Sequence, residues 1–171
     1  MNHMNNHQAP ETPRYSLKDF TPLISIIGII VLLTIIKQSV YGFSIHSAMY
    51  DLMGFFFVVF SAFKIINLPG FVEAYSTYDI ITKRYITWGY IYPFIELSLG
   101  LAYLTRYQLT AANLITVVLM IIGSIGVAQE LAQKKSITCA CLGAVFKIPM
   151  TYVTLAEDII MGVMALVMLF L

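Results

Sequence analysis

Charged residues are scarce in this chain of 171 residues. Lys, Arg, Asp and Glu make up 11% of it, whereas about a quarter of a typical soluble domain is charged. Hydrophobic residues reach 59%, and the mean hydropathy is +0.82. This balance excludes an ordinary soluble domain and indicates an integral membrane protein.

Other features are also missing, and each absence excludes a class of protein. The formal net charge is only +1, with ten scattered Lys and Arg, so the sequence lacks the basic patch that nucleic-acid binding requires. Its two cysteines are too few for the disulfide framework of a small secreted fold. The sequence has no phosphate-binding loop, no hydrolase nucleophile motif and no zinc-protease helix.

What the sequence has instead is a series of apolar runs long enough to cross a membrane. A hydrocarbon core about 30 Å thick is spanned by about 20 apolar residues in a helix. Five runs approach or reach that length, namely 22–41, 48–66, 88–104, 110–128 and 152–171. Because the connection between the third and fourth runs is very short, these two helices are expected to be adjacent and antiparallel.

The remaining segments complete the expected domain organisation. Residues 1–21 are polar and contain two prolines, which predicts a flexible cytoplasmic tail. The run at 22–43 is predicted to be an added transmembrane helix that is retained, because no small-residue cleavage site follows it. The segment Phe71 to Tyr85 has aromatic residues at helical spacing with charged residues between them. That pattern predicts a short helix in the membrane interface.

The predicted fold class is therefore an all-α integral membrane protein. It consists of a four-helix transmembrane bundle over 48–171, one N-terminal transmembrane helix and a short interfacial helix. In the interfacial segment, Glu73, Tyr75, Tyr78 and Asp79 are interpreted as solvated residues and membrane anchors. Small residues are expected to let the helices approach closely; they are Gly100, Ala102, Gly123, Ser124, Gly126, Ala156, Gly162 and Ala165.

The distribution of Lys and Arg predicts the orientation. With a cytoplasmic N-terminus, the cytoplasmic side receives eight of the ten Lys and Arg residues, and the other side receives only Lys37 and Arg106. Cytoplasmic loops carry such an excess of positive charge. We therefore expect the inner (plasma) membrane of a bacterium, with the C-terminus outside. Cys139 and Cys141 would then lie at the cytoplasmic face or just beneath it.

Cys139 and Cys141 are the residues with the most distinctive chemistry. Two thiolates one residue apart can hold a single soft cation such as copper(I) or mercury(II). They can also close a small, strained disulfide of the readily reduced kind. The remaining interpretation is that both are buried thiols that act as small apolar residues.

Two adjacent carboxylates follow the cysteines, one turn into the last run. Thr154 and Glu157 have the spacing of a capping box, so a helix cap accounts for one carboxylate. Since only one of two adjacent residues is expected to face the interior directly, the other of Glu157 and Asp158 is a candidate base or ligand for the cysteine site. Met150 is a candidate thioether ligand, although membrane methionines are usually packing residues.

Glu96 lies within the third run, close to Pro93. A carboxylate there costs about 2.5–3.5 kcal/mol on insertion scales, so it should face the interior and find a partner. Lys64, near the cytoplasmic end of the second run, is the candidate partner. The two residues form either a purely structural pair or part of a transport or relay path.

Several motifs in order resemble the MauE/DoxX-like redox-associated membrane proteins. They are Gly70-Phe71-Val72-Glu73-Ala74-Tyr75, Tyr92-Pro93-Phe94-Ile95-Glu96-Leu97, Cys139-Ala140-Cys141-Leu142-Gly143 and Glu157-Asp158-Ile159-Ile160-Met161. The resemblance covers about Ala48 to Leu171 and implies a four-helix membrane bundle. Methylamine-utilisation members of this family assist the maturation, including disulfide formation, of a periplasmic dehydrogenase together with a thioredoxin-like partner. The resemblance implies a similar role for this chain. Related members carry a heavy-metal-associated domain ahead of the bundle, which implies copper or mercury handling.

Two functions stay open, together with a third interpretation in which the protein is a scaffold without chemistry. The preferred hypothesis is a transporter or acceptor of copper(I) or mercury(II), supplied by a soluble metallochaperone, with a ligand set of Cys139, Cys141, Glu96, Asp158 and Met150. The absence of a second cysteine pair to relay electrons across the bilayer favours it. The alternative is a thiol–disulfide redox protein that assists the maturation of partner proteins in methylamine metabolism. In that case Cys139 and Cys141 are the redox pair, Glu157 is the base, and a quinone or a thioredoxin-like protein is the redox partner.

Overall fold

The computed structural model describes residues 21–133, 138–139, 148–149 and 152–170, with side chains over 21–133 and 155–170. Helices make up nearly all of this part of the chain: α1 (Thr21–Tyr41), α2 (Ile45–Ile66), α3 (Leu68–Tyr75), α4 (Ile86–Thr105), α5 (Leu109–Ala132) and α6 (Tyr152–Phe170). Two very short antiparallel strands, β1 (Thr138–Cys139) and β2 (Ile148–Pro149), pair Cys139 with Ile148. The prediction of an all-helical protein is confirmed, apart from this small strand pair.

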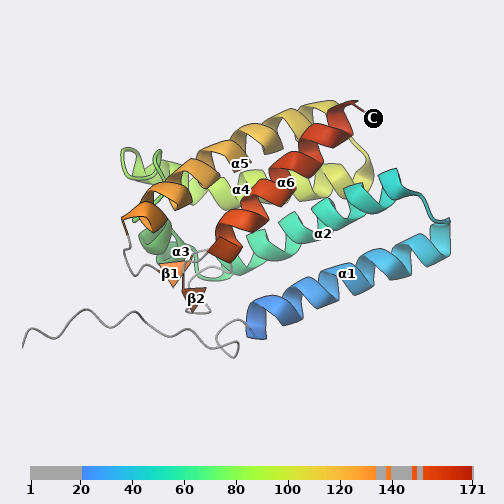
Figure 1. Ribbon diagram of the computed structural model, residues 1–171, viewed down its shortest axis with the longest axis horizontal. Helices are drawn as coiled ribbons and strands as arrows, with labels where there is room; N and C mark the ends of the chain where they lie inside the picture. Colours follow the sequence, from blue (N-terminus) through green and yellow to red (C-terminus); the bar gives the residue numbers. More distant parts are fainter. Residues whose placement is uncertain (1–20, 134–137, 140–147, 150–151, 171) are drawn as a thin grey trace, which may run out of the picture.

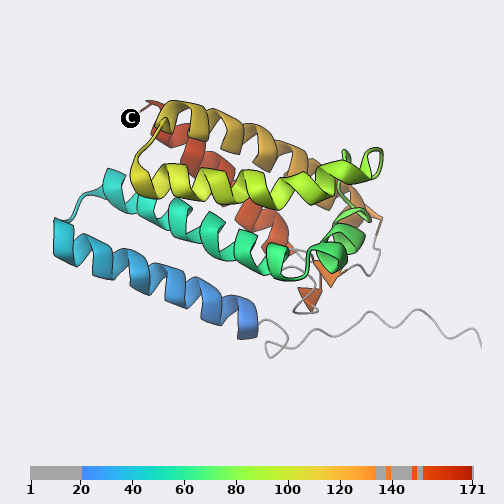
Figure 2. The same ribbon diagram turned by 180° about the vertical axis from the view of Figure 1, so that it is seen from behind.

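The five long helices run alternately in opposite directions, as Figures 1 and 2 show from the two sides. Helix α2 packs along α4, α5 packs along α6, and α1 lies on the outside against α2. Helix α3, strands β1 and β2 and the first turn of α1 lie toward one end of the molecule, which we call the α3 end. The α1–α2 and α4–α5 connections and the last turn of α6 lie at the opposite end.

Three of the described helices, α1, α2 and α5, are long and apolar enough to cross a membrane. Large apolar side chains such as Ile24, Leu32 and Ile121 point outward and are more than half exposed. That arrangement suits a hydrocarbon environment, because lipid tails solvate such side chains as well as a protein core does. The chain is therefore a membrane protein, and three of the five predicted crossings meet this criterion.

Small residues bring the paired helices together. A Cβ added at Gly100 of α4 would lie 2.9 Å from the backbone nitrogen of Val58 and 3.1 Å from the carbonyl oxygen of Gly54, both on α2. Such close backbone approach is typical of membrane helix interfaces with small residues. The packing role predicted for Gly100 is confirmed, whereas that of Gly54 was not foreseen.

The short connection between α4 and α5 reverses the chain within three residues. Arg106 and Gln108 both adopt left-handed backbone angles, with φ of 60° and 50°. The two helices are antiparallel and in contact, as predicted from the short connection. Each of them nevertheless makes its larger interface with another helix, α4 with α2 and α5 with α6.

The predicted interfacial helix over Phe71 to Tyr85 is wrong in its extent. Helix α3 begins after Asn67, whose side chain accepts a hydrogen bond from the Gly70 amide at 3.3 Å. It ends at Tyr75, and turns follow as far as residue 84. Asp79 stabilises one of these turns, because its Oδ2 accepts hydrogen bonds from the backbone amide and the hydroxyl of Thr82 at 2.6 and 2.7 Å.

The expected exposure of this segment is also wrong. Tyr75 and Tyr78 are each only 5% exposed, and Asp79 is completely buried. The physical reason is that the segment folds against the ends of the long helices, so its aromatic residues pack inward. Gly126 of α5 permits this approach, because a Cβ there would lie 2.7 Å from the carbonyl oxygen of Tyr78. Glu73 alone among the four residues keeps the exposure predicted for it.

Candidate functional site

A cavity of about 50 Å³ lies between the helices at the α3 end, and we call it the polar cavity. A buried water needs about 10–15 Å³ of such space, so the cavity can hold a few waters or a small ion. Its polar lining comprises Lys64, Glu96, Glu157, Asp158 and the tyrosines Tyr75, Tyr78 and Tyr92. Apolar side chains of α2, α3 and α5 complete the wall, including Phe56, Phe60, Phe71, Met120 and Val127.

An ion pair between α2 and α4 forms one side of the polar cavity. The Lys64 ammonium donates to both carboxylate oxygens of Glu96, at 2.6 and 2.5 Å, and both side chains are more than nine-tenths buried. The same ammonium lies 5.6 Å from the ring centroid of Phe71 and 5.1 Å from that of Tyr92, within the range of cation–π attraction. The predicted partnership of Lys64 and Glu96 is thereby confirmed.

A group of aromatic rings in contact joins α3 to α4 around this ammonium. The ring centroid of Tyr75 lies 4.9 Å from those of Phe71 and Tyr92, and 5.4 Å from that of Tyr78. Burial, and next the neighbouring Tyr92, raise the pKa of Tyr75 well above its usual value of 10. Tyr75 therefore stays protonated and remains a hydrogen-bond donor beside the cavity.

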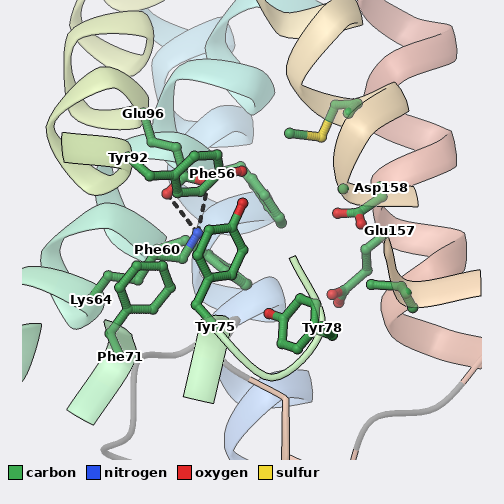
Figure 3. Close-up of a pocket in the computed structure, with 13 residues that line it drawn as sticks. Phe56, Phe60, Lys64, Phe71, Tyr75, Tyr78, Tyr92, Glu96, Glu157 and Asp158 are labelled. Atoms are coloured by element: carbon green, nitrogen blue, oxygen red, sulfur yellow. Dashed lines mark hydrogen bonds and ion pairs between the residues drawn. The ribbon is translucent and has the colours of Figure 1, made fainter. Parts of the chain in front are cut away.

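The carboxylates Glu157 and Asp158 of α6 form the other side of the cavity, facing Lys64 and Glu96 in Figure 3. The prediction that only one of them faces the interior is wrong. Successive helical residues are about 100° apart, so a cavity that spans a wide face of α6 receives both. Gly123 of α5 makes room for Asp158, since a Cβ there would lie 3.3 Å from Asp158 Oδ2.

The capping explanation for Glu157 is also wrong. Helix α6 begins at Tyr152, so Thr154 is already inside the helix and cannot be the N-cap residue of a capping box. The Oε1 atom of Glu157 is buried and has no hydrogen-bond partner in the described part of the chain. Glu157 is thus a buried hydrogen-bond acceptor at the edge of the cavity.

Negative charge exceeds positive charge among the described residues that line the polar cavity. One ammonium, Lys64, faces three carboxylates, those of Glu96, Glu157 and Asp158. Buried charges without partners are costly, and the cost is relieved by taking up protons or a cation. The arrangement can therefore accept and release protons, and it can stabilise a small positive charge.

The strand that carries Cys139 lies next to this site. Strand β1 contacts α3, the helix that supplies Phe71 and Tyr75 to the cavity wall. Cys141 and Met150 lie outside the described residues, and of Cys139 the structure describes only the backbone. The predicted thiol pair and the predicted thioether ligand therefore stay predictions.

The described residues lend no support to the metal hypothesis. No group of three or more His, Cys, Asp or Glu side chains in the described part of the chain is arranged to hold a metal ion. Of the predicted ligands, Glu96 and Asp158 have described side chains; they come from different helices, and Glu96 is already paired with Lys64.

Another buried carboxylate, that of Asp51, was missed in the sequence. It lies near the start of α2, at the end opposite the polar cavity. Its oxygens accept hydrogen bonds from Lys37 at 2.8 Å, Gln38 at 2.7 Å and Arg106 at 2.6 Å. Asp51 thus connects α1 to α2 and to the end of α4. Its position as the sole acidic residue in the run 48–66 was the signal that could have revealed it.

Comparison with known proteins places the chain in a family. No curated protein and no solved structure matches it significantly. A family model does match, that of the methylamine utilisation protein MauE, over residues 43–171. The matched region contains α2 to α6, and thus all residues of the polar cavity. With its apolar helices and this match over more than half of its length, the chain belongs to the MauE family of membrane proteins linked to methylamine utilisation.

Proposed function

We propose that this protein is a membrane thiol–disulfide redox protein that assists the maturation of partner proteins in methylamine utilisation. Membership of the MauE family supports this function better than metal transport. The structural observation that carries the proposal is the contact between β1, which contains Cys139, and α3, which closes the polar cavity. A cysteine strand beside a buried set of carboxylates is a suitable setting for thiol chemistry that releases protons.

Cys139 and Cys141 form the redox pair in this proposal. One thiolate attacks a disulfide of a thioredoxin-like partner, so that one sulfur–sulfur bond breaks as a mixed disulfide forms. The second thiolate then displaces the partner as a dithiol, and the pair is left oxidised. The reverse sequence delivers a disulfide to the partner. Glu157, with its unpartnered carboxylate oxygen, is the base that takes the thiol proton.

The proposed arrangement in the membrane has five crossings, α1, α2, α4, α5 and α6. Residues 48–171 form the four-helix bundle, and the helix at 22–43 is an addition to it. The alternating directions of the helices support an odd number of crossings, and the eight-to-two distribution of Lys and Arg supports a cytoplasmic N-terminus. The cysteine strand then lies on the cytoplasmic side of a bacterial plasma membrane, where a thioredoxin-like partner reaches it.

Thiol trapping of the full chain in lipid nanodiscs tests this function. After equilibration with mixtures of reduced and oxidised glutathione, we expect reversible formation of one disulfide, which is lost in Cys139→Ser and in Cys141→Ser. Glu157→Gln should slow exchange with thioredoxin by about 10²-fold or more, the usual contribution of a general base. Glu73→Gln, which changes an exposed glutamate of α3, is the matched control and should exchange at the original rate.

A pair that stays reduced at every glutathione ratio would refute the redox function. Sub-micromolar binding of copper(I) or mercury(II) that is lost in both serine variants would then restore the metal hypothesis.

A further inference from the structure

A second hollow lies between α5 and α6 on the outer surface of the helices. It is an apolar groove of about 300 Å³, which we call the α5–α6 groove. Its rim includes Ile121 and Ile125 of α5 and Val163 of α6, each roughly half exposed. Because the chain is a membrane protein, side chains exposed in this way face lipid. The groove is therefore open to apolar molecules dissolved in the bilayer.

Asp158 belongs to both the α5–α6 groove and the polar cavity. Among the described residues that line the groove, Asp158 is the only charged one. Ser124 is the other residue there whose side chain can form hydrogen bonds. A carboxylate next to lipid is expensive and is, by default, a sign of function. Asp158 thus provides a polar link between the membrane-facing groove and the buried carboxylates beside the cysteine strand.

We propose that the α5–α6 groove binds a membrane quinone, which accepts the electrons of the cysteine pair; this inference rests on the proposed redox function. The sequence contains only two cysteines, so no second pair within the chain can take over the electrons. The electrons therefore leave the chain, either to a partner disulfide or to a separate two-electron carrier, and a carrier that reaches this groove is soluble in lipid. The groove holds the apolar tail, and Asp158 and Ser124 meet the oxygens of the ring.

The charge of the site favours a quinone over a phospholipid as the occupant. Asp158 and its neighbour Glu157 repel the phosphate of a phospholipid headgroup. A neutral quinone ring carries carbonyl oxygens that accept hydrogen bonds, and its reduced form carries hydroxyls that donate to a carboxylate. Both states of the ring therefore suit a site whose polar groups are one acid and one hydroxyl.

The reaction balances without any other reactant. The two thiols lose two protons and two electrons, and one sulfur–sulfur bond forms between them. The quinone gains both electrons and two protons, so that its two carbonyl oxygens become hydroxyls. Glu157 and Asp158 transfer the protons, because they line the cavity on one side and Asp158 also lines the groove.

Decylubiquinone is the probe for the test, with the full chain in nanodiscs. The chain reduced with dithiothreitol and freed of reductant should convert one equivalent of the probe to quinol, and a photoreactive decylubiquinone should label peptides of α5 or α6. Val163→Trp and Ile125→Trp fill the groove and should each weaken probe binding about tenfold or more, a loss of about 1.4 kcal/mol or more. Ile160→Trp is the control, because Ile160 is 59% exposed on α6 and lies outside the groove lining; it should bind the probe normally.

The outcomes separate this inference from the function on which it rests. If the wild-type pair exchanges disulfides with glutathione but reduces no decylubiquinone, the quinone inference is overturned and the redox function stands. If labelling falls outside α5 and α6, or decanol displaces the probe as well as unlabelled decylubiquinone does, the groove is a lipid site and the inference also fails. If the pair never cycles, the proposed function fails, and labelling alone decides whether the groove binds a quinone.

Discussion

The Lys64 ammonium meets both oxygens of Glu96 and lies near two aromatic rings, and the side chains of this ion pair are more than nine-tenths buried. In such surroundings, removing one partner of an ion pair lowers the stability of the fold more than removing both partners does. A carboxylate left alone has neither water nor a cation to stabilise it, whereas two apolar or neutral side chains can simply pack. Among the residues that line the polar cavity, we therefore expect single substitutions at Lys64 or Glu96 to lower the stability of the protein most.

Replacing Lys64 with Met should destabilise the protein by about 3–5 kcal/mol, because Glu96 then becomes an uncompensated buried charge. Unfolding in mixed detergent micelles, followed by circular dichroism, measures the change. The double variant Lys64→Met with Glu96→Gln should recover much of the loss.

Lys37→Met is the matched control for this prediction. The Lys37 side chain is 29% exposed, and its partner Asp51 keeps Gln38 and Arg106, so the cost should be about 1 kcal/mol or less. If Lys64→Met and Lys37→Met lowered the free energy of unfolding equally, the prediction that the buried Lys64–Glu96 pair matters more than the partly exposed Lys37 would be contradicted.

At the scale of the helices, the contact between α2 and α4 depends on backbone proximity at Gly100. This contact fixes Lys64 of α2 beside Glu96 of α4, since the two residues lie on the same pair of helices. A side chain at position 100 would meet the backbone of Val58, which cannot rotate away as a flexible side chain can. The helices would then have to separate, and the polar cavity would lose one of its walls.

Gly100→Ala should therefore lower the free energy of unfolding by about 1–3 kcal/mol, the usual cost of overpacking. Gly28→Ala is the control, because no heavy atom lies within 4 Å of the added Cβ. It should be neutral or stabilise α1 by about 0.5–1 kcal/mol, since alanine is the better helix former. Thermal unfolding of both variants in the same detergent checks the difference, and a stable Gly100→Ala protein would contradict the close approach.

At the scale of the whole molecule, the alternating helices put the start of α1 and the end of α6 at opposite ends. With five crossings and a cytoplasmic N-terminus, a C-terminal alkaline phosphatase fusion should be active, because this reporter works only outside the cytoplasm. A membrane-impermeant maleimide should label the cysteines in inverted membrane vesicles and not in intact spheroplasts. An inactive fusion, or labelling of the cysteines in intact spheroplasts, would contradict the proposed orientation.

The long helices were predictable because their apolar runs are unbroken, and the predicted and observed ends of α2 and α5 differ by four residues or fewer. The pairing of Lys64 with Glu96 was predictable because an ionisable residue within a membrane helix requires a partner. The burial of Tyr75, Tyr78 and Asp79 was not predictable from the sequence. An amphipathic pattern places aromatic residues on one face, but it does not say whether lipid or protein covers that face.

The cavity was only partly predictable for a similar reason. Glu157 and Asp158 were recognised as chemically important, yet their shared orientation depends on how α6 is rotated against α5. That rotation follows from Gly123 and Gly162, which accept Asp158 and Met120 of the neighbouring helix. The pattern of small residues indicates which helices approach closely and leaves their rotation open.

The position of Thr21, where α1 begins, determines how close a domain attached ahead of α1 would lie to the cysteine strand. Since α1 starts toward the end that carries β1, any domain joined ahead of this helix is tethered close to Cys139. A short flexible tether gives an effective concentration in the millimolar range. With the proposed redox function and five crossings, a thioredoxin fused there would exchange disulfides as an intramolecular reaction, whereas the same thioredoxin fused after Phe170 would be held on the far side of the bilayer.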